Sequence, residues 1–168
     1  MRKLALVAVL ALAGTLSLAA CSNNNADKQQ NQQQAVQKVT KPTNPNNTEA
    51  WQKYLSQVLG QHLQGMTASR PYPYLIPAGS SSAAKAGRQR QLNNVTGVVL
   101  RGVTPGNLLA FAGPSSTKTA DLVVKAFQKV SPGALKGVIV LFIGDKADKA
   151  RVGAVVKPTG AEYRFVAM

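Results

Sequence analysis

The side chains that could carry out chemistry are few and widely spaced. The chain has one histidine, His62, and one cysteine, Cys21, too few for a zinc site built from histidine and cysteine ligands. A Ser-His-Asp triad needs its histidine beside a serine, and no Gly-x-Ser-x-Gly elbow is present. Asp145 and Asp148 resemble an acid/base pair, but at the start of a predicted helix they are more simply explained by capping and the helix dipole. The sequence therefore predicts no enzyme, no metal and no cofactor, and a small hydrolase is the least favoured alternative.

A second group of residues could bind an anion. Ser115, Ser116 and Thr117 follow a short apolar run and open a predicted helix, with Lys118 beside them. Backbone N–H groups at a helix start attract anions, although serine and threonine there also serve as ordinary caps. Both interpretations stay open. The Gly-Lys-Ser/Thr core of a P-loop is absent. Together with nearby arginines, the candidate anion-binding residues are Arg88, Arg90, Arg101, Ser115, Ser116 and Lys118.

The charge is strongly one-sided. Two of the 20 basic residues lie in the first three positions, so the chain beyond residue 20 carries 18 basic and six acidic residues. Residues 50–120 contain no acidic residue. Such a field attracts polyanions, for example lipopolysaccharide, phospholipid headgroups, peptidoglycan carboxylates or an acidic protein, and no nucleic acid is expected. The alternative is a solvated basic surface that resists aggregation.

The N-terminus has the three parts of a secretory signal. Two basic residues open the chain, residues 4–18 form an apolar run without charge, and Ala19 and Ala20 close it. The run is too short to span the hydrocarbon core comfortably as a helix. Cys21 follows directly, and the rest of the chain offers no second cysteine for a disulfide. We therefore expect residues 1–20 to be a signal peptide.

The motif Leu18-Ala19-Ala20-Cys21 resembles the lipobox of bacterial lipoprotein precursors. This resemblance implies cleavage between Ala20 and Cys21, diacylglycerol on the Cys21 sulfur and acylation, typically with palmitate, of the new amino terminus. Ser22, in place of aspartate, implies an outer-membrane address in a Gram-negative bacterium, with the domain facing the periplasm. Two or three acyl chains hold a protein stably on a membrane, whereas one binds marginally.

A polar tether follows the anchor. Residues 22–47 are rich in asparagine and glutamine and bury too little apolar surface to order themselves. The sequence therefore predicts three parts: a signal peptide over 1–20, a lipidated cysteine with a disordered tether over 21–47, and one folded domain over 48–168.

The first half of that domain, residues 48–106, is expected to be helical and proline-rich. Apolar residues recur at helical spacing over 49–63. Residues 70–77 contain three prolines, which favour an extended loop. This loop either packs onto the domain or docks a partner through Tyr72, Tyr74, Leu75 and Ile76. Residues 84–103 are compatible with helix or strand, and we favour helix as far as Arg101.

The second half, residues 107–168, shows a clearer alternation. Strands are expected at 108–112, 137–144 and 161–168, and helices at 115–130 and 146–156. The continuous apolar run at 137–144 predicts a central strand, and the alternation in 161–168 predicts an edge strand. The expected fold is therefore α/β, with a small three-stranded, mostly parallel sheet and one or two additional N-terminal helices.

Two functions are compatible with these features. The first is a lipid-anchored periplasmic domain that acts as a structural or protein-interaction component of an envelope assembly of secretion, pilus or conjugation type. The second is a basic binding module for an envelope polyanion such as lipopolysaccharide or peptidoglycan. The expected partners are membrane lipid through Cys21, an envelope protein and a polyanionic envelope component.

Overall fold

The computed structural model describes residues 39–168. The predicted signal peptide, Cys21 and most of the predicted tether lie outside the described residues. Among the described helices, none is both long and apolar enough to cross a membrane.

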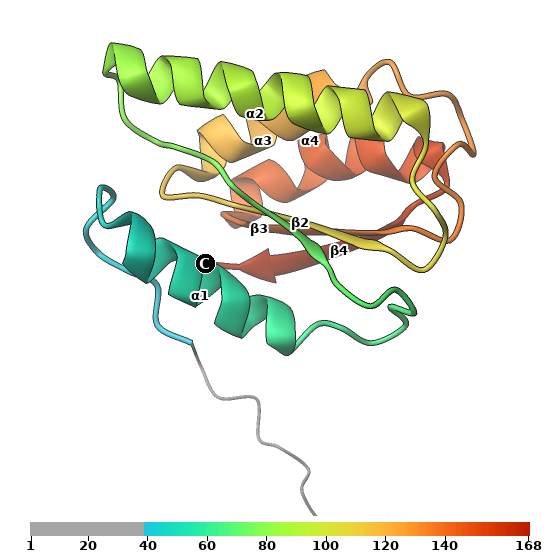
Figure 1. Cartoon of the computed structure of the whole chain (residues 1–168), viewed down its shortest axis with the longest axis horizontal. Helices are drawn as coiled ribbons and strands as arrows, with labels where there is room; N and C mark the ends of the chain where they lie inside the picture. Colours follow the sequence, from blue (N-terminus) through green and yellow to red (C-terminus); the bar gives the residue numbers. More distant parts are fainter. Residues whose placement is uncertain (1–38) are drawn as a thin grey trace, which may run out of the picture. The chain divides into compact units, whose positions relative to one another are not determined.

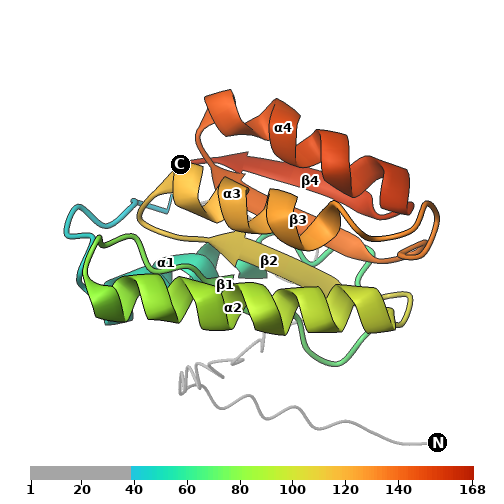
Figure 2. The same ribbon diagram turned by 90° about the horizontal axis from the view of Figure 1, so that it is seen from above.

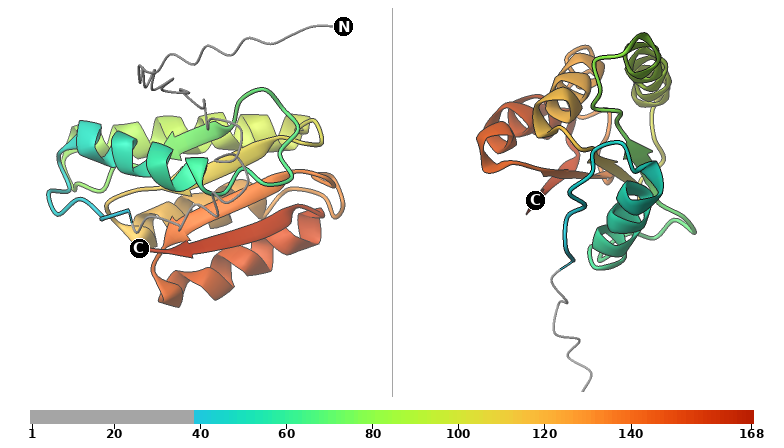
Figure 3. Two further views of the ribbon diagram at one scale, coloured as in Figure 1. Left: turned by 90° about the horizontal axis from the view of Figure 1, so that it is seen from below. Right: turned by 90° about the vertical axis from the view of Figure 1, so that its left-hand side faces the viewer.

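The domain is built on four parallel strands that follow one another across the sheet in chain order. They are β1 (Tyr72–Leu75), β2 (Leu108–Ala112), β3 (Ile139–Gly144) and β4 (Glu162–Ala167). The connecting helices are α2 (Ser82–Arg101), α3 (Ser116–Phe127) and α4 (Lys146–Val156), the last followed by the short 3-10 helix η1 (Lys157–Thr159). Crossovers between parallel strands share one hand, so all three helices lie on the same face of the sheet (Figures 1 and 2). Helix α1 (Thr48–Gly60) covers the opposite face (Figure 3).

The prediction of three strands is wrong, because residues 72–75 form a fourth. Tyr72 pairs with Leu109 and Leu75 with Ala112 on β2. The prolines around β1 favour a loop by sequence alone, but proline is tolerated on an edge strand where its missing N–H would face outward. The Tyr74 ring stacks on Phe111 at 5.0 Å between ring centroids, which ties this edge to the core.

Strands β2 and β3 are buried on both faces, which explains their continuous apolar sequence. Alternate residues enter two separate cores. Leu109, Phe111, Val140 and Phe142 pack under α2, α3 and α4. The core on the other face is formed with α1 by Leu108, Ala110, Ala112, Ile139, Leu141 and Ile143.

Most of the other predicted elements are confirmed. Residues 82–101 are helical, with the Ser81 hydroxyl accepting from Ala84 N–H, and α4 has the predicted bounds. Helix α3 begins one residue later and ends three residues earlier than expected. Helix α1 ends at Gly60, earlier than the expected end at residue 63, because the N–H groups of Gln61 and His62 turn back to the Val58 and Leu59 carbonyls at 3.1 and 2.9 Å. Strand β4 is an edge strand, as predicted.

Candidate functional site

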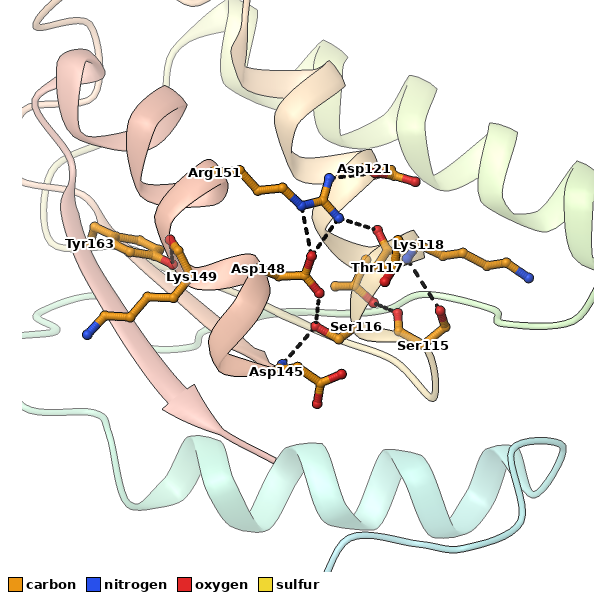
Figure 4. Close-up of polar contacts among 11 residues, drawn as sticks. Ser115, Ser116, Thr117, Lys118, Asp121, Asp145, Asp148, Lys149, Arg151 and Tyr163 are labelled. Carbon is orange, nitrogen blue, oxygen red and sulfur yellow. Dashed lines mark hydrogen bonds and ion pairs between the residues drawn. The ribbon is translucent and has the colours of Figure 1, made fainter.

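The carboxyl ends of β2 and β3 hold a buried polar cluster (Figure 4). Ser116, at the start of α3, donates its hydroxyl hydrogen to Asp148 Oδ2 on α4 and accepts a hydrogen bond of 2.7 Å from Asp145 N–H. Ser116 is only 3% exposed and Asp148 only 7%. The serine hydroxyl therefore joins two helices and is closed to a substrate.

Arg151 extends this cluster to the surface. Its guanidinium contacts Asp148 Oδ1 at 2.8 Å and Asp121 Oδ1 at 2.6 Å, and donates to the Thr117 carbonyl at 3.0 Å. The hydrogen bond to Asp121 is the largest contribution that raises the pKa of Arg151. Two of the three acidic residues on this face are thus occupied by one arginine, which links α4 to α3.

Asp145 stands at the N-cap position of α4, but its side chain forms no capping hydrogen bond. The prediction that the Asp145 carboxylate caps α4 is therefore wrong. Asp145 instead contributes its backbone N–H, which donates a hydrogen bond to the Ser116 hydroxyl.

The predicted anion-binding residues near the start of α3 have internal partners. Ser115 caps α3 by accepting from Lys118 N–H at 3.4 Å. The Lys118 ammonium donates to the Ala78 carbonyl. Arg88 donates to the carbonyls of Pro77 and Gly79 at 3.0 and 2.7 Å. These two cations therefore hold the segment after β1 against α2 and α3.

The same two cations also line a groove between α2 and α3, with a volume of about 190 Å³. Lys85 and Lys125 are exposed at its rim. The one acidic residue that lines it, Asp121, is already bound to Arg151. The groove follows α2 from Lys85 to Leu92 and α3 from Lys118 to Lys125. It can therefore accept an anionic group without displacing a resident carboxylate. Its lining residues are Lys85, Arg88, Gln89, Leu92, Lys118, Asp121, Leu122 and Lys125.

The remaining candidates lie elsewhere. Arg90 and Arg101 are exposed on α2 outside this groove. In the candidate docking segment, Tyr74 and Ile76 are buried and Leu75 is half-buried, whereas Tyr72 is 47% exposed. Most of this segment therefore packs into the two cores, and Tyr72 remains on the surface.

Sequence reasoning missed a larger hollow beside α4 and β4. It has a volume of about 850 Å³ and is lined by Lys146, Lys149, Ala150, Gly153, Ala154, Lys157, Pro158, Tyr163 and Phe165. One face of α4 carries small residues and lysines, and this pattern could have indicated the hollow. It predicts a hollow only once β4 is known to lie beside that face.

Within residues 39–168 no group of three histidine, cysteine, aspartate or glutamate side chains is placed to hold a metal ion. The chain matches no protein-family model, and neither curated proteins nor solved structures gave a match.

Proposed function

We propose that this chain is a lipid-anchored protein of the cell envelope whose folded domain binds a multivalent envelope anion through its α2–α3–α4 layer. One observation carries the proposal, namely the segregation of charge between the two faces of the sheet. Helices α2, α3 and α4 contain four, two and three basic residues, and their two acidic residues are both bound by Arg151. Helix α1, on the other face, contains one basic and one acidic residue.

The mechanism is electrostatic. Exposed lysines and arginines on one surface add their fields, so an anion with many phosphates or carboxylates is attracted more strongly than a single ion. Because these side chains lie in water, the attraction is screened over about 8 Å at physiological ionic strength. Binding should therefore weaken steeply with salt. The groove between α2 and α3 gives one anionic group a defined place on this surface.

Binding of the full-length protein to lipopolysaccharide micelles and to purified peptidoglycan at increasing salt tests the proposal. The variant Lys85→Glu/Lys125→Glu reverses two rim charges of the α2–α3 groove. The matched control Lys41→Glu/Lys53→Glu makes the same charge change at exposed positions away from it. The lipid anchor is common to both, so its contribution cancels. We expect the groove variant to bind about tenfold more weakly than the control. Equal binding of the two variants would refute the proposal. Stronger binding to lipopolysaccharide would indicate that the protein recognises phosphates, and stronger binding to peptidoglycan that it recognises carboxylates.

A second candidate function is a protein-interaction component of an envelope assembly of secretion, pilus or conjugation type. It is favoured by the open outer edge of the sheet at β4. Crosslinking in intact cells with the lipidated protein as bait tests it. One dominant protein partner supports this function, whereas recovery of cell wall or lipopolysaccharide alone supports the polyanion module.

A further inference from the structure

The outer edge of β4 is free for strand pairing. Glu162 N–H donates to Val138 O at 2.8 Å, and Met168 N–H donates to Gly144 O at 3.1 Å. Backbone direction alternates along a strand, so the even-numbered residues of β4 face β3. Tyr163, Phe165 and Ala167 therefore direct their N–H and C=O groups away from the sheet. Among the described strands none pairs on that side.

The opposite edge, at β1, is poorly suited to strand pairing. Ile76 N–H donates to Ala112 O at 2.8 Å, so by the same alternation the odd-numbered residues face outward. Pro71, Pro73 and Pro77 occupy three of these positions, and proline has no N–H to offer. The two edges are thus chemically different, and only β4 presents a regular row of donors and acceptors.

The hollow of about 850 Å³ runs alongside this open edge. Tyr163 and Phe165 line it from β4, and Ala150, Gly153 and Ala154 line it from α4. A Cβ at Gly153 would lie 3.0 Å from the Tyr163 ring, so the glycine lets that ring lie against the helix. Tyr163 also donates its hydroxyl hydrogen to the Lys149 carbonyl at 3.0 Å. A strand added beside β4 would therefore direct alternate side chains into a space that already exists.

The positive charge around this hollow indicates which kind of partner strand fits it. Lys146, Lys149 and Lys157 are exposed at its walls, and no carboxylate is among its lining residues. The Lys149 ammonium lies 5.4 Å from the centroid of the Phe165 ring. A second copy of this chain pairing through β4 would bring two sets of these lysines together, so like charges disfavour it. A segment with acidic side chains at alternate positions complements them.

We propose that the β4 edge binds an extended acidic segment of a partner protein as a fifth strand. Its backbone pairs with residues 163, 165 and 167, in the manner of β-strand addition. Its acidic side chains lie beside α4 and contact Lys146, Lys149 and Lys157. This site is separate from the α2–α3 groove, and it goes beyond the binding of an envelope polyanion.

The test uses the full-length protein in non-ionic detergent and a short fluorescent peptide in which glutamate alternates with valine. Fluorescence anisotropy measures the affinity. We expect N-methylation of the peptide amides that face β4 to weaken binding about tenfold, because it removes the interstrand donors. Ala167→Pro removes one outward N–H at an exposed position, and about fivefold weaker binding is expected. Ala167→Ser keeps the N–H and is its control.

Charge is tested separately. Lys149→Glu/Lys157→Glu should weaken peptide binding at least about tenfold at low salt, whereas Lys125→Glu/Lys129→Glu, an equal change near α3, should leave it unchanged. If the N-methylated peptide binds as well as the parent, the protein binds acidic chains without strand pairing and the proposal is wrong. Absence of peptide binding, or displacement of the peptide by self-association through β4, also refutes it. Polyanion binding is tested with Lys85→Glu/Lys125→Glu, and strand addition with the N-methylated peptide and Ala167→Pro, so the two proposals can fail independently.

Discussion

Ser116 on α3 and Asp148 on α4 are joined by a hydrogen bond although they lie 32 positions apart in the chain. Both side chains are buried. The serine accepts from the N–H that follows β3, and the aspartate is bound on its other side by Arg151. One buried polar cluster therefore fixes how two neighbouring helices sit over the carboxyl end of the sheet.

Removing Asp148 should be costly for stability. Asp148→Ala leaves the buried Ser116 hydroxyl without its acceptor and takes one carboxylate from Arg151, so we expect a loss of about 2–4 kcal/mol in the free energy of unfolding. Asp145→Ala is the matched control, because that side chain is exposed and forms no cap bond, and it should change stability by less than about 0.5 kcal/mol. Urea denaturation compares the two. Similar losses in both variants would mean that the cluster contributes little.

Gly113 lies where β1 and β2 approach each other at their carboxyl ends. A Cβ there would collide with the Ile76 carbonyl oxygen and lie 2.8 Å from Thr119 Oγ1. Ile76 directly follows β1, and its N–H is bound to the Ala112 carbonyl. Its carbonyl therefore cannot move freely, and Gly113→Ala should cost about 1–3 kcal/mol. Gly60→Ala, at the end of α1 with nothing near the added methyl, should be neutral or stabilise by up to about 1 kcal/mol. Melting temperatures of the two variants check this, and an unperturbed Gly113→Ala protein would contradict the close approach.

The alkaline stability of the domain should depend on Tyr163. Burial raises the pKa of its phenol to about 12, from an ordinary value of 10.0. As pH rises through this interval the unfolded chain loses the phenol proton first, so the folded state binds more protons and the free energy of unfolding falls. The stabilisation that the buried, protonated Tyr163 gives to the folded state is complete below pH 10.0 and is lost as the pH rises to about 12.

Tyr163→Phe should make that alkaline decline shallower without abolishing it, because burial also raises the pKa of Tyr54 and Tyr74. At neutral pH the same variant should lose about 1 kcal/mol with the hydrogen bond to the Lys149 carbonyl. Urea midpoints measured between neutral and strongly alkaline pH give both effects. An unchanged slope in the variant would show that Tyr163 ionises equally in both states.

The lipid anchor is tested at Cys21. Cys21→Ser removes the sulfur that the lipobox resemblance requires, and the protein should move from the membrane fraction to the soluble fraction of the envelope. Metabolic labelling with palmitate should be lost in the same variant, whereas Ser22→Ala, at the next position, should remain labelled. Unchanged membrane fractionation of Cys21→Ser would contradict the lipoprotein interpretation.

The sequence predicted most of the framework because its signals are local. The apolar run of β3 and the helical spacing of α4 each depend on residues close together in the chain. Strand β1 was missed for the same reason. Its prolines favour extended backbone locally, and only the pairing of Tyr72 with Leu109 shows that they lie on a sheet edge where they are tolerated.

The site could not be derived in this way. Ser115 and Ser116 are neighbours with the same side chain, yet one caps α3 and the other is buried against Asp148. Ser115 is the N-cap of α3 with extended backbone, whereas Ser116 is its first helical residue, so their roles follow from where α3 begins and how it is rotated against α4. That rotation is a property of the packed domain. The charge segregation likewise required knowing that three helices share one face.

The prolines of β1 also limit how copies of this domain can associate. A sheet with two open edges can join a neighbour on each side, and many copies then grow into a continuous ribbon, the geometry of fibrous aggregates. Here Pro71, Pro73 and Pro77 remove three donors from one edge, so even if two copies paired through β4, edge-to-edge growth would stop at that pair. The stretch that looked least like a strand thus protects the domain from polymerisation.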